Sequence, residues 1–344
     1  MSHSIFGTRI IAAPMAGGTS TPGFVTAVHG AGGLGFLAAG YKTVAAVQAE
    51  IAGVRAAGAR FGMNLFVPDP AQLPPSPAVL ARLEDYRSEL EADAARYGVD
   101  VPPLRLDDDD HWDAKVQALL DDPVEWVSFT FGLPGAGIVQ ALQRAGSTVL
   151  ATVTTAAEAV EAAGQGVDAL VVQHPGAGGH SAAFRPQPAG GGDGAPGTTA
   201  ELVTRVRAAV GLPLVAAGGV MDRSGVDTAL AAGAQAAQLG TAFLRTGESG
   251  ARQLHKDALA SPHFTRTVMT RAFTGRPARA LVNEFVRDHP DAPESYPAVH
   301  HLTAPLRAAA ASAGDPERLN LWAGTGWQQA RAGSVAEVMA GLLD

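Results

Sequence analysis

Cysteine is absent from the 344-residue sequence, and lysine is rare. Without cysteine the protein has no disulfide framework, thiolate metal site, iron–sulfur cluster or cysteine nucleophile. The only lysines are Lys42, Lys115 and Lys256, and none closely follows a segment that we expect to form a strand. A Schiff-base aldolase is therefore also disfavoured.

Basic clusters and long apolar runs are missing as well. The formal net charge is −8 and Arg and Lys do not cluster, which argues against nucleic acid as a partner. The longest uncharged apolar run is far shorter than the roughly 20 residues that cross a bilayer. Residues 1–9 lack the basic-then-apolar pattern of a signal peptide, so we expect a cytoplasmic protein without a membrane partner.

An acidic run, Asp107 to Asp110, raises the question of a metal site. Four consecutive carboxylates on one loop cannot all face a single ion. We therefore expect a solvated run and no metal.

Apolar, β-branched segments alternate with alanine-rich helical segments along the chain. Such alternation predicts a parallel sheet in an α/β protein. Eight units in this length predict closure into a TIM (β/α)8 barrel rather than an open doubly wound sheet. Helices are expected at 44–57, 137–145, 156–163, 199–209 and 223–232, and strands at 10–13, 33–37, 61–65, 125–130, 148–152, 169–173, 213–217 and 236–239.

Two regions interrupt the alternation. Residues 68–124 begin with a proline-rich stretch and continue with a helical pattern, which predicts a helical insertion that acts as a lid or cap. Residues 249–344 are helical and punctuated by proline, and we expect them to pack on the barrel as a C-terminal extension. The barrel itself then comprises residues 1–67 and 125–248. Residues 187–197 are rich in Gly and Pro and are expected to form a mobile loop.

The candidate catalytic residue is His180. It follows the expected strand end, Gln173, by seven residues, and Gly178 and Gly179 immediately precede it. An imidazole titrates near neutrality and can act as a general base or as a hydrogen-bond donor to a substrate anion. The alternative is an ordinary surface-loop histidine, but the glycines favour a loop that approaches a ligand.

Two glycine turns are candidates for phosphate binding. Gly218-Gly219 follows the seventh expected strand and Gly240-Thr241 follows the eighth. Barrels bind phosphate at these two positions, where backbone N–H groups face the anion. Each turn alone is consistent with a tight connection, whereas adjacent turns favour a phosphate site.

Small and amide residues near the first strands suggest a flat ligand. Pro14 and Met15 follow the first strand, and Asn64 lies on the third. Small residues and a methionine allow the backbone to lie against an aromatic ring, while Asn64 and Gln173 offer amide groups to its edge. Ordinary filling of the barrel core is the alternative.

These motifs together resemble the nitronate monooxygenases, which are FMN-dependent barrels. The resemblance runs in order from residue 8 to the end of the chain and implies that FMN is the cofactor and His180 the catalytic residue. It is carried by the segments 13–18, 32–36, 64–66, 127–132, 173–180, 217–220, 238–241, 274–279 and 322–326. The residues expected to hold FMN are Ala13, Pro14, Met15, Asn64, Gln173, Gly178, Gly179, Gly218, Gly219, Gln238, Leu239, Gly240 and Thr241.

The resemblance implies oxidation of an alkyl nitronate, such as propionate 3-nitronate, by O2 to a carbonyl compound and nitrite. Neutral nitroalkanes are further candidate substrates, and a homodimer is compatible with the resemblance. The chain departs from the family at Gly176, where an acidic residue is common. Loss of that carboxylate should leave His180 less cationic.

Two alternatives remain open. An NAD(P)H-dependent flavin reductase of quinones or enoyl thioesters shares the histidine loop, but the sequence shows no evident Arg/Lys cluster for a dinucleotide. A flavin-binding protein without turnover, such as a sensor or carrier, belongs to another class, and His180 argues against it.

Overall fold

The barrel expected from the alternation is present. The computed structural model describes residues 4–69, 75–185 and 197–343. Eight parallel strands close in the order β1-β2-β3-β4-β5-β6-β8-β9, which confirms the TIM-barrel fold class. The barrel strands are β1 (Ile10–Ala12), β2 (Leu34–Ala38), β3 (Phe61–Phe66), β4 (Trp126–Thr130), β5 (Thr148–Val153), β6 (Ala169–Gln173), β8 (Leu214–Ala217) and β9 (Ala236–Leu239).

The barrel strands begin and end within one residue of the predicted positions. Their residues are almost all buried, because helices cover the outside and side chains fill the inside. Several helices begin at a side-chain cap, and Thr43, Thr155 and Asp222 each accept from an N–H group of the first turn. The helices are α1 (Pro22–Gly30), α2 (Val44–Ala56), α3 (Pro77–Glu89), α4 (Glu91–Ala95), α5 (Trp112–Asp121), α6 (Ala136–Arg144), α7 (Ala156–Gly164), α8 (Thr199–Ala209), α9 (Arg223–Ala231), α10 (Gln253–Ala260), α11 (Glu284–Asp288), α12 (Ala298–Ser312) and α13 (Val335–Leu343), with short 3-10 helices η2 (Thr241–Phe243), η3 (Pro316–Arg318) and η4 (Trp327–Gln329).

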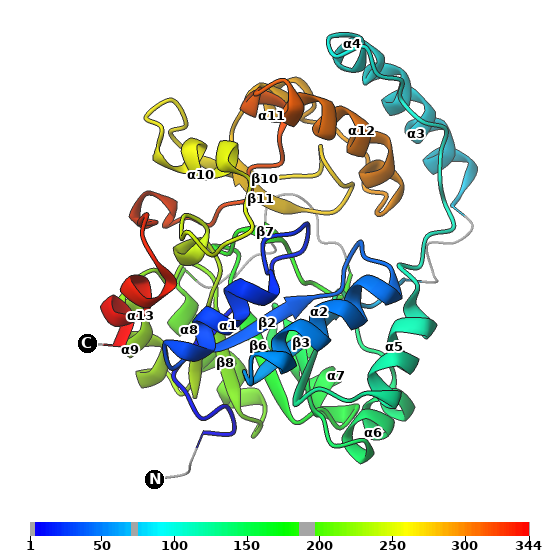
Figure 1. Cartoon of the computed structure of the whole chain (residues 1–344). Coiled ribbons are helices and arrows are strands. Elements are labelled where there is room, and N and C mark those ends of the chain that lie inside the picture. The colour runs from blue at the N-terminus through cyan, green and yellow to red at the C-terminus, as the bar shows by residue number, and fades with distance from the viewer. Residues whose placement is uncertain (1–3, 70–74, 186–196, 344) are drawn as a thin grey trace.

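A second layer covers one end of the barrel (Figure 1). Helices α3, α4, α10, α11 and α12 lie in this layer together with a small antiparallel sheet. The sheet has the order β10-β11-β7, with β10 at Thr267–Thr270, β11 at Ala278–Leu281 and β7 at Gly179–His180. In it Ala278 pairs with His180, so the loop after β6 is held by a segment about 100 residues further along the chain.

Two helices differ from the predicted division of the chain. Helix α5 lies within the expected insertion 68–124, but it packs against α2 and α6 in the ring around the barrel. Helix α13 lies in the expected C-terminal extension, yet it packs against α1 and α9 in the same ring. Both helices therefore belong with the barrel by packing, and the covering layer is formed by the remaining parts of the two regions.

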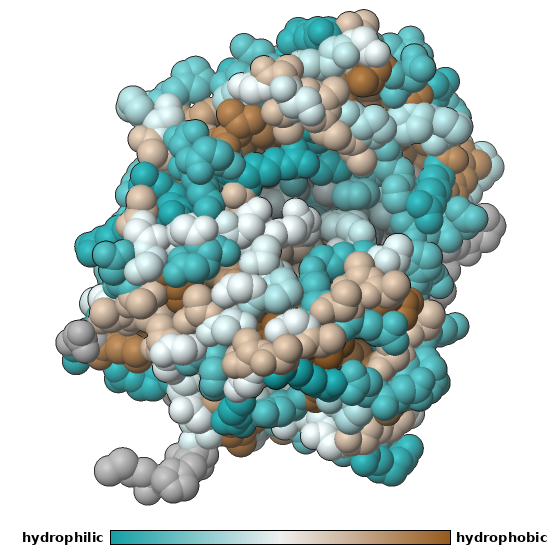
Figure 2. Space-filling view, viewed as in Figure 1, coloured by the Kyte–Doolittle hydropathy of each residue, from teal (hydrophilic) through white to brown (hydrophobic). Residues whose placement is uncertain are grey.

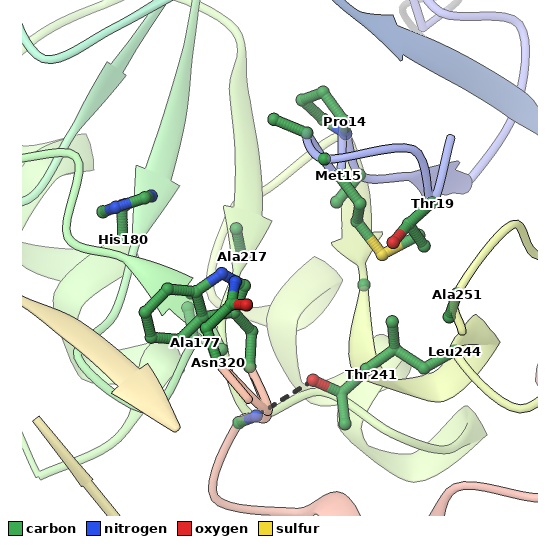
Figure 3. A pocket seen from close by; sticks show the side chains of 18 of the residues that line it. Pro14, Met15, Thr19, Ala177, His180, Ala217, Thr241, Leu244, Ala251 and Asn320 are labelled. Carbon is green, nitrogen blue, oxygen red and sulfur yellow. Dashed lines mark hydrogen bonds between the residues drawn. The ribbon is translucent and has the colours of Figure 1, made fainter. Parts of the chain in front are cut away.

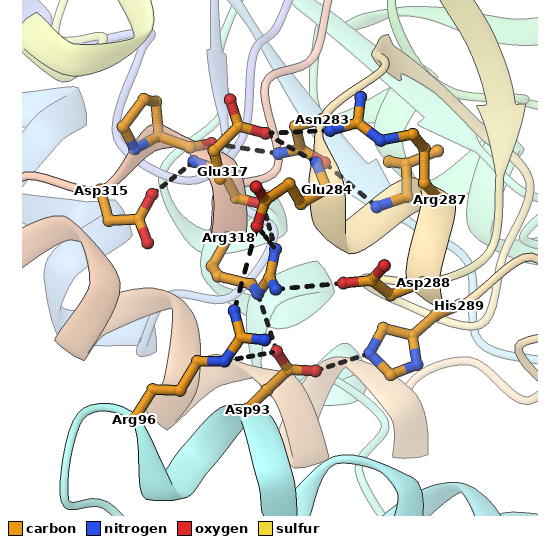
Figure 4. Close-up of polar contacts among 12 residues, drawn as sticks. Asp93, Arg96, Asn283, Glu284, Arg287, Asp288, His289, Asp315, Glu317 and Arg318 are labelled. Carbon is orange, nitrogen blue, oxygen red and sulfur yellow. Dashed lines mark hydrogen bonds and ion pairs between the residues drawn. The ribbon is translucent and has the colours of Figure 1, made fainter.

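A buried arginine ties α4 to the C-terminal part of the covering layer (Figure 4). Arg318 is fully buried, and its guanidinium donates to Asp93 at 2.7 Å, to Asp288 at 3.0 Å and to Glu284 at 3.1 Å. His289 contacts the other oxygen of Asp93 at 2.8 Å. Paired charges of this kind resist separation because one partner left alone would be a buried, uncompensated charge.

The acidic run is not the solvated segment expected from the sequence. Asp107 and Asp109 are exposed, but Asp108 lies 2.7 Å from His301 Nε2 and Asp110 lies 2.7 Å from the buried Lys115 Nζ. Asp108 and Asp110 are therefore partly buried beside basic side chains, and Asp110 also accepts from the N–H of Tyr41 at 2.9 Å. Within the described ranges no group of three or more acidic or histidine side chains is placed to hold a metal.

The expected mobile loop at 187–197 falls almost entirely outside the described residues. No helix among the residues described is both long and apolar enough to cross a bilayer.

Candidate active site

A cavity of about 370 Å³ opens where the carboxyl ends of the barrel strands meet the covering layer. Its volume is within the ~300–1,000 Å³ of small-molecule sites. The space-filling view shows the surface hollowed between the two layers (Figure 2), and the close-up shows His180 and Met15 on opposite sides of the space (Figure 3). The residues proposed from the sequence all line this cavity: Ala13, Pro14, Met15, Asn64, Gln173, Gly178, Gly179, His180, Gly218, Gly219, Gln238, Leu239, Gly240 and Thr241.

The glycine turns after β8 and β9 present free backbone donors to the cavity. Gly218 and Gly219 have φ angles of +100° and +74°, which glycine adopts without strain. Their N–H groups donate to no other group in the part of the chain that the structure describes. Thr241 Oγ1 accepts from the N–H of Gly324 at 3.0 Å and so fixes this wall to the C-terminal segment (Figure 3). This arrangement fits a phosphate group.

Asn64 is held in one orientation by its neighbours on β4. Its Nδ2 donates to Ser128 Oγ at 2.9 Å, to the Ser128 carbonyl at 3.1 Å and to Thr130 Oγ1 at 2.9 Å. These contacts use the amide hydrogens and leave Oδ1 without a recorded donor from the described residues. Asn64 is buried and lines the cavity, so Oδ1 is a fixed acceptor for the edge of a ring.

Gln173 has a structural task in addition to the one expected from the sequence. Its Nε2 donates to the carbonyl of His180 at 3.1 Å, and its Oε1 accepts from the N–H of Ala182 at 2.8 Å. The side chain at the end of β6 therefore holds the histidine loop from inside, while β11 holds it from outside.

The His180 imidazole is enclosed by aromatic rings. The ring centroids of Trp322, Phe131, Tyr296 and Phe66 lie 5.4, 5.6, 5.9 and 6.4 Å from that of His180. Burial among these rings, reinforced by the charges of two arginines in the covering layer, lowers the pKa of His180 to about 3. The imidazole is therefore neutral at physiological pH.

The electrostatic character of the cavity is cationic. No Asp or Glu occurs among the described residues that line it, whereas Arg252 and Arg307 both do. Arg307 donates to the neutral groups His300 and Asn320 and forms no ion pair with a described carboxylate. Burial lowers the pKa of Arg307 to about 10, which still leaves it protonated at neutral pH.

A third arginine, Arg276, does not line the cavity but packs on Phe131, one of the rings around His180. It is 5% exposed, stacks on Phe131 at 3.9 Å and donates Nε to the Ser181 carbonyl at 3.3 Å. Arg276 lies on Phe131 beside His180 and Arg307 donates to His300, so both charges lie on the histidine side of the cavity, where they lower the pKa of His180. This side is suited to an anionic ligand.

Several residues that line the cavity were not recognised in the sequence. Tyr41 directly follows the Gly40 turn after β2, a position at the functional face that could have been recognised. Its ring stacks on His300 at 4.1 Å. His300, Arg307 and Asn320 come from the covering layer, and no local pattern in the sequence marks them.

Gly176, where the chain departs from the family pattern, does not line the cavity. A Cβ atom there would lie 2.9 Å from Thr325 Oγ1 and 3.0 Å from His174 Nδ1. The Gly176 carbonyl also accepts from the N–H of Thr325 at 2.9 Å. A side chain at this position would therefore meet the C-terminal segment before it could reach the imidazole of His180.

Known proteins are similar to this chain in sequence and in fold. A model of the nitronate monooxygenase family matches residues 2–344. A probable nitronate monooxygenase of Staphylococcus aureus (strain MRSA252) is 33% identical over 344 residues, covering 97% of this chain and 93% of the relative. The crystal structure of a nitroalkane oxidase from Streptomyces ansochromogenes has a TM-score of 0.91 at 48% identity, covering 98% and 95%. FabK from Thermotoga maritima has a TM-score of 0.72 at 24% identity, covering 98% and 92%, and shares the fold.

The fold and the cavity define a TIM-barrel enzyme whose cavity, at the carboxyl ends of the strands, is lined by His180 and by the glycine turns after β8 and β9. The chain belongs to the nitronate monooxygenase family, and it is a flavin-dependent oxidoreductase.

Proposed function

We propose that this protein binds FMN and oxidises small alkyl nitronates with O2, releasing a carbonyl compound and nitrite. In the overall reaction two nitronate anions and one O2 give two carbonyl compounds and two nitrite ions. Propionate 3-nitronate is a suitable test substrate.

The cationic cavity carries this proposal. It is lined by Arg252 and Arg307 and by no described carboxylate. The electrostatic potential of the cavity therefore favours the binding of anions and disfavours the binding of cations. A nitronate is an anion, and so is the phosphate of FMN. Arg307 and Arg276 on the histidine side stabilise the nitronate charge, while the free N–H groups of Gly218 and Gly219 are placed to receive the phosphate.

The residues present fit a flavin mononucleotide. Met15 and the small residues after β1 form one wall, Asn64 Oδ1 is the acceptor for the ring edge, and the turns after β8 and β9 hold the phosphate. When bound, the flavin supplies the electron-accepting ring that the side chains of this protein lack. The chain itself binds the substrate anion, excludes water with the aromatic rings around His180, and exchanges a proton at the imidazole.

The test begins with the purified protein. We expect a yellow protein that releases FMN, and not FAD, on denaturation, and that produces nitrite from propionate 3-nitronate in air. A colourless protein that does not take up FMN would overturn the proposal.

A second arm separates the alternatives. The protein is mixed anaerobically with NADH, NADPH and propionate 3-nitronate in turn while the flavin absorbance is followed. We expect the nitronate to change the spectrum. Rapid bleaching by NADH or NADPH alone would support a quinone or enoyl-thioester reductase instead, and no response to any of the three would support a flavin-binding protein without turnover.

A further inference from the structure

The His180 imidazole has one polar partner among the described residues. Its Nε2 lies 2.9 Å from Oγ1 of Thr274, which is 2% exposed. The other ring nitrogen, Nδ1, has no hydrogen-bond partner among the residues described and is not a fully buried atom. Since His180 lines the cavity, Nδ1 is accessible from it.

Thr274 is held in a rigid turn. The N–H groups of Thr274 and Gly275 both donate to the carbonyl of Arg271, at 3.2 and 2.8 Å. Gly275 has φ +78°, and a Cβ atom there would lie 2.6 Å from the carbonyl oxygen of Ser295. The Thr274 hydroxyl therefore contacts an imidazole whose backbone is held by Gln173 and by pairing with β11. Both partners of this hydrogen bond are fixed in position.

The hydrogen bonds of Thr274 favour one proton arrangement. A threonine hydroxyl has a single hydrogen to donate, and Thr274 Oγ1 lies within reach of two acceptors, His180 Nε2 at 2.9 Å and the Arg276 carbonyl at 3.3 Å. No other donor to the Arg276 carbonyl is recorded in the described part of the chain. If Thr274 donates to Arg276 and accepts from an N–H at His180 Nε2, every one of these polar groups is satisfied; the reverse arrangement leaves the carbonyl without a donor.

We propose that Thr274 is a positioning residue that keeps the single proton of His180 on Nε2 and leaves the Nδ1 lone pair facing the cavity as a base. The inference rests on the proposed function and extends it to neutral nitroalkanes. The α C–H bond of the nitroalkane breaks, its proton goes to Nδ1, and its electron pair moves into the nitro group to form the nitronate. The resulting imidazolium still donates from Nε2 to Thr274.

The charges around His180 keep the free imidazole unprotonated and so leave its lone pair available before substrate binds. The titratable and charged groups that face it are Arg276 on the Thr274 turn, Arg307 and His300 on α12, and Tyr296 before α12. None of them is an acid that would hold a proton on the free imidazole. The nitronate formed next to the imidazolium supplies the opposite charge that stabilises it.

The direct test is the tautomer of His180 in the FMN-loaded protein. Histidine side chains are labelled with 15N, the His180 signals are assigned by their absence in His180→Asn, and the protonated nitrogen is identified by NMR. We expect Nε2–H in the parent protein. A proton on Nδ1 would overturn the proposal, and this measurement does not depend on turnover or on the folding of a Thr274 variant.

The kinetic test compares 1-nitropropane with pre-formed propyl-1-nitronate in the variants Thr274→Val and Thr274→Ser. Thr274→Val should lower kcat/KM for the neutral nitroalkane by about 10–100-fold, a part of the 10²–10⁴-fold typical of general base catalysis. It should change kcat/KM for the nitronate less than about twofold, and Thr274→Ser should restore both. Thr246→Val is the matched control, because Thr246 is equally buried but donates to the Phe243 carbonyl and does not line the cavity.

Equal losses on both substrates with an unchanged tautomer would show that Thr274 acts only structurally. If the parent protein releases nitrite from neither substrate, the proposed function fails, and the NMR measurement still decides where the proton of His180 resides.

Discussion

Gln173 and His180 are joined by a hydrogen bond from the side-chain amide of one to the backbone carbonyl of the other, at 3.1 Å. The amide thus fixes where the imidazole lies rather than what it does chemically. Because Gln173 ends a barrel strand, the position of the histidine is transmitted from the most rigid part of the fold.

His180→Asn should keep the flavin bound and reduce turnover, because the imidazole lines the cavity and, in the proposed function, serves the substrate rather than the cofactor. We expect a loss of about 10²–10⁴-fold with a neutral nitroalkane and a smaller loss with the pre-formed nitronate. Flavin content is measured by absorbance and turnover by nitrite release. Equal losses would assign His180 to binding of the nitro group, and unchanged kinetics would remove it from the mechanism.

The pH profile of the parent protein gives an independent measurement. The pKa of His180 is lowered to about 3, chiefly by burial, so its neutral form persists as the pH falls well below the ordinary value of 6.5. The rate with a neutral nitroalkane should therefore show no loss near pH 6.5 that depends on His180. A descending limb near pH 6.5 that disappears in His180→Asn would contradict this environment for the imidazole.

A substitution at Gly240 should affect flavin binding without a comparable effect on folding stability. A Cβ atom there would lie 3.6 Å from Ala13 Cβ and Met15 Sδ, an ordinary contact, and its φ is −111°. Gly240→Val should therefore change the unfolding free energy by less than about 1 kcal/mol but should strongly reduce flavin content, because the side chain enters the expected phosphate site. Gly211→Val, a glycine with open space around it and outside the cavity, is the control.

Gly218 should behave differently. Its φ is +100°, and a Cβ atom would lie 2.6 Å from the carbonyl of His174. Gly218→Val should therefore destabilise the protein itself, by roughly 1–3 kcal/mol from backbone strain alone, as measured by urea unfolding.

The outcome that would contradict the phosphate site concerns Gly240→Val. If this variant keeps full flavin occupancy, the phosphate does not lie at the turn after β9.

Arg318→Leu should lower the unfolding free energy by roughly 3–5 kcal/mol, because it leaves Asp93 buried without its main partner. The comparison is Arg223→Leu, which breaks an exposed pair with Asp227 and should cost at most about 1 kcal/mol. Urea unfolding measures both. Similar losses in the two variants would show that the network does not hold α4 to the C-terminal part of the covering layer.

His255 should make stability depend on pH. Burial lowers its pKa to about 4, while its Nε2 contacts the Trp322 carbonyl at 3.0 Å. The unfolded chain takes up the proton near pH 6.5 and the folded protein does not, so the stabilisation is complete above pH 6.5 and is lost as the pH falls towards 4. His255→Gln should therefore lose less unfolding free energy than the parent between pH 7 and pH 5. An equal loss in both proteins would show that His255 is not buried in its neutral form.

The barrel and its glycine turns could be predicted from the sequence because both depend on local chemistry. Buried parallel strands are continuous apolar runs, and side-chain caps begin several of the helices between them. The turns at Gly218 and Gly240, and the loop that carries His180, follow strand ends directly and therefore had to meet at one end of the barrel.

The covering layer could not be predicted in the same way. Residues 68–124 read as one insertion, but α5 joins the barrel ring because it packs against α2 and α6. The acidic run reads as solvated, but Asp108 lies against His301 on α12, and Asp110 is paired with the nearby Lys115 and accepts from the N–H of the distant Tyr41. Sequence patterns report which face of an element is apolar, and they do not report which distant partner satisfies a polar group.

The sequence by itself determined the barrel, the place of the cavity and the histidine that faces it, because each follows from the order of strands and glycine turns. The tertiary structure decided the chemistry of that histidine. Thr274 lies 94 residues from His180 in sequence, and Arg307 reaches the same site from α12. Only folding brings these groups together, so the charge of the cavity and the protonation of His180 are properties of the packed molecule.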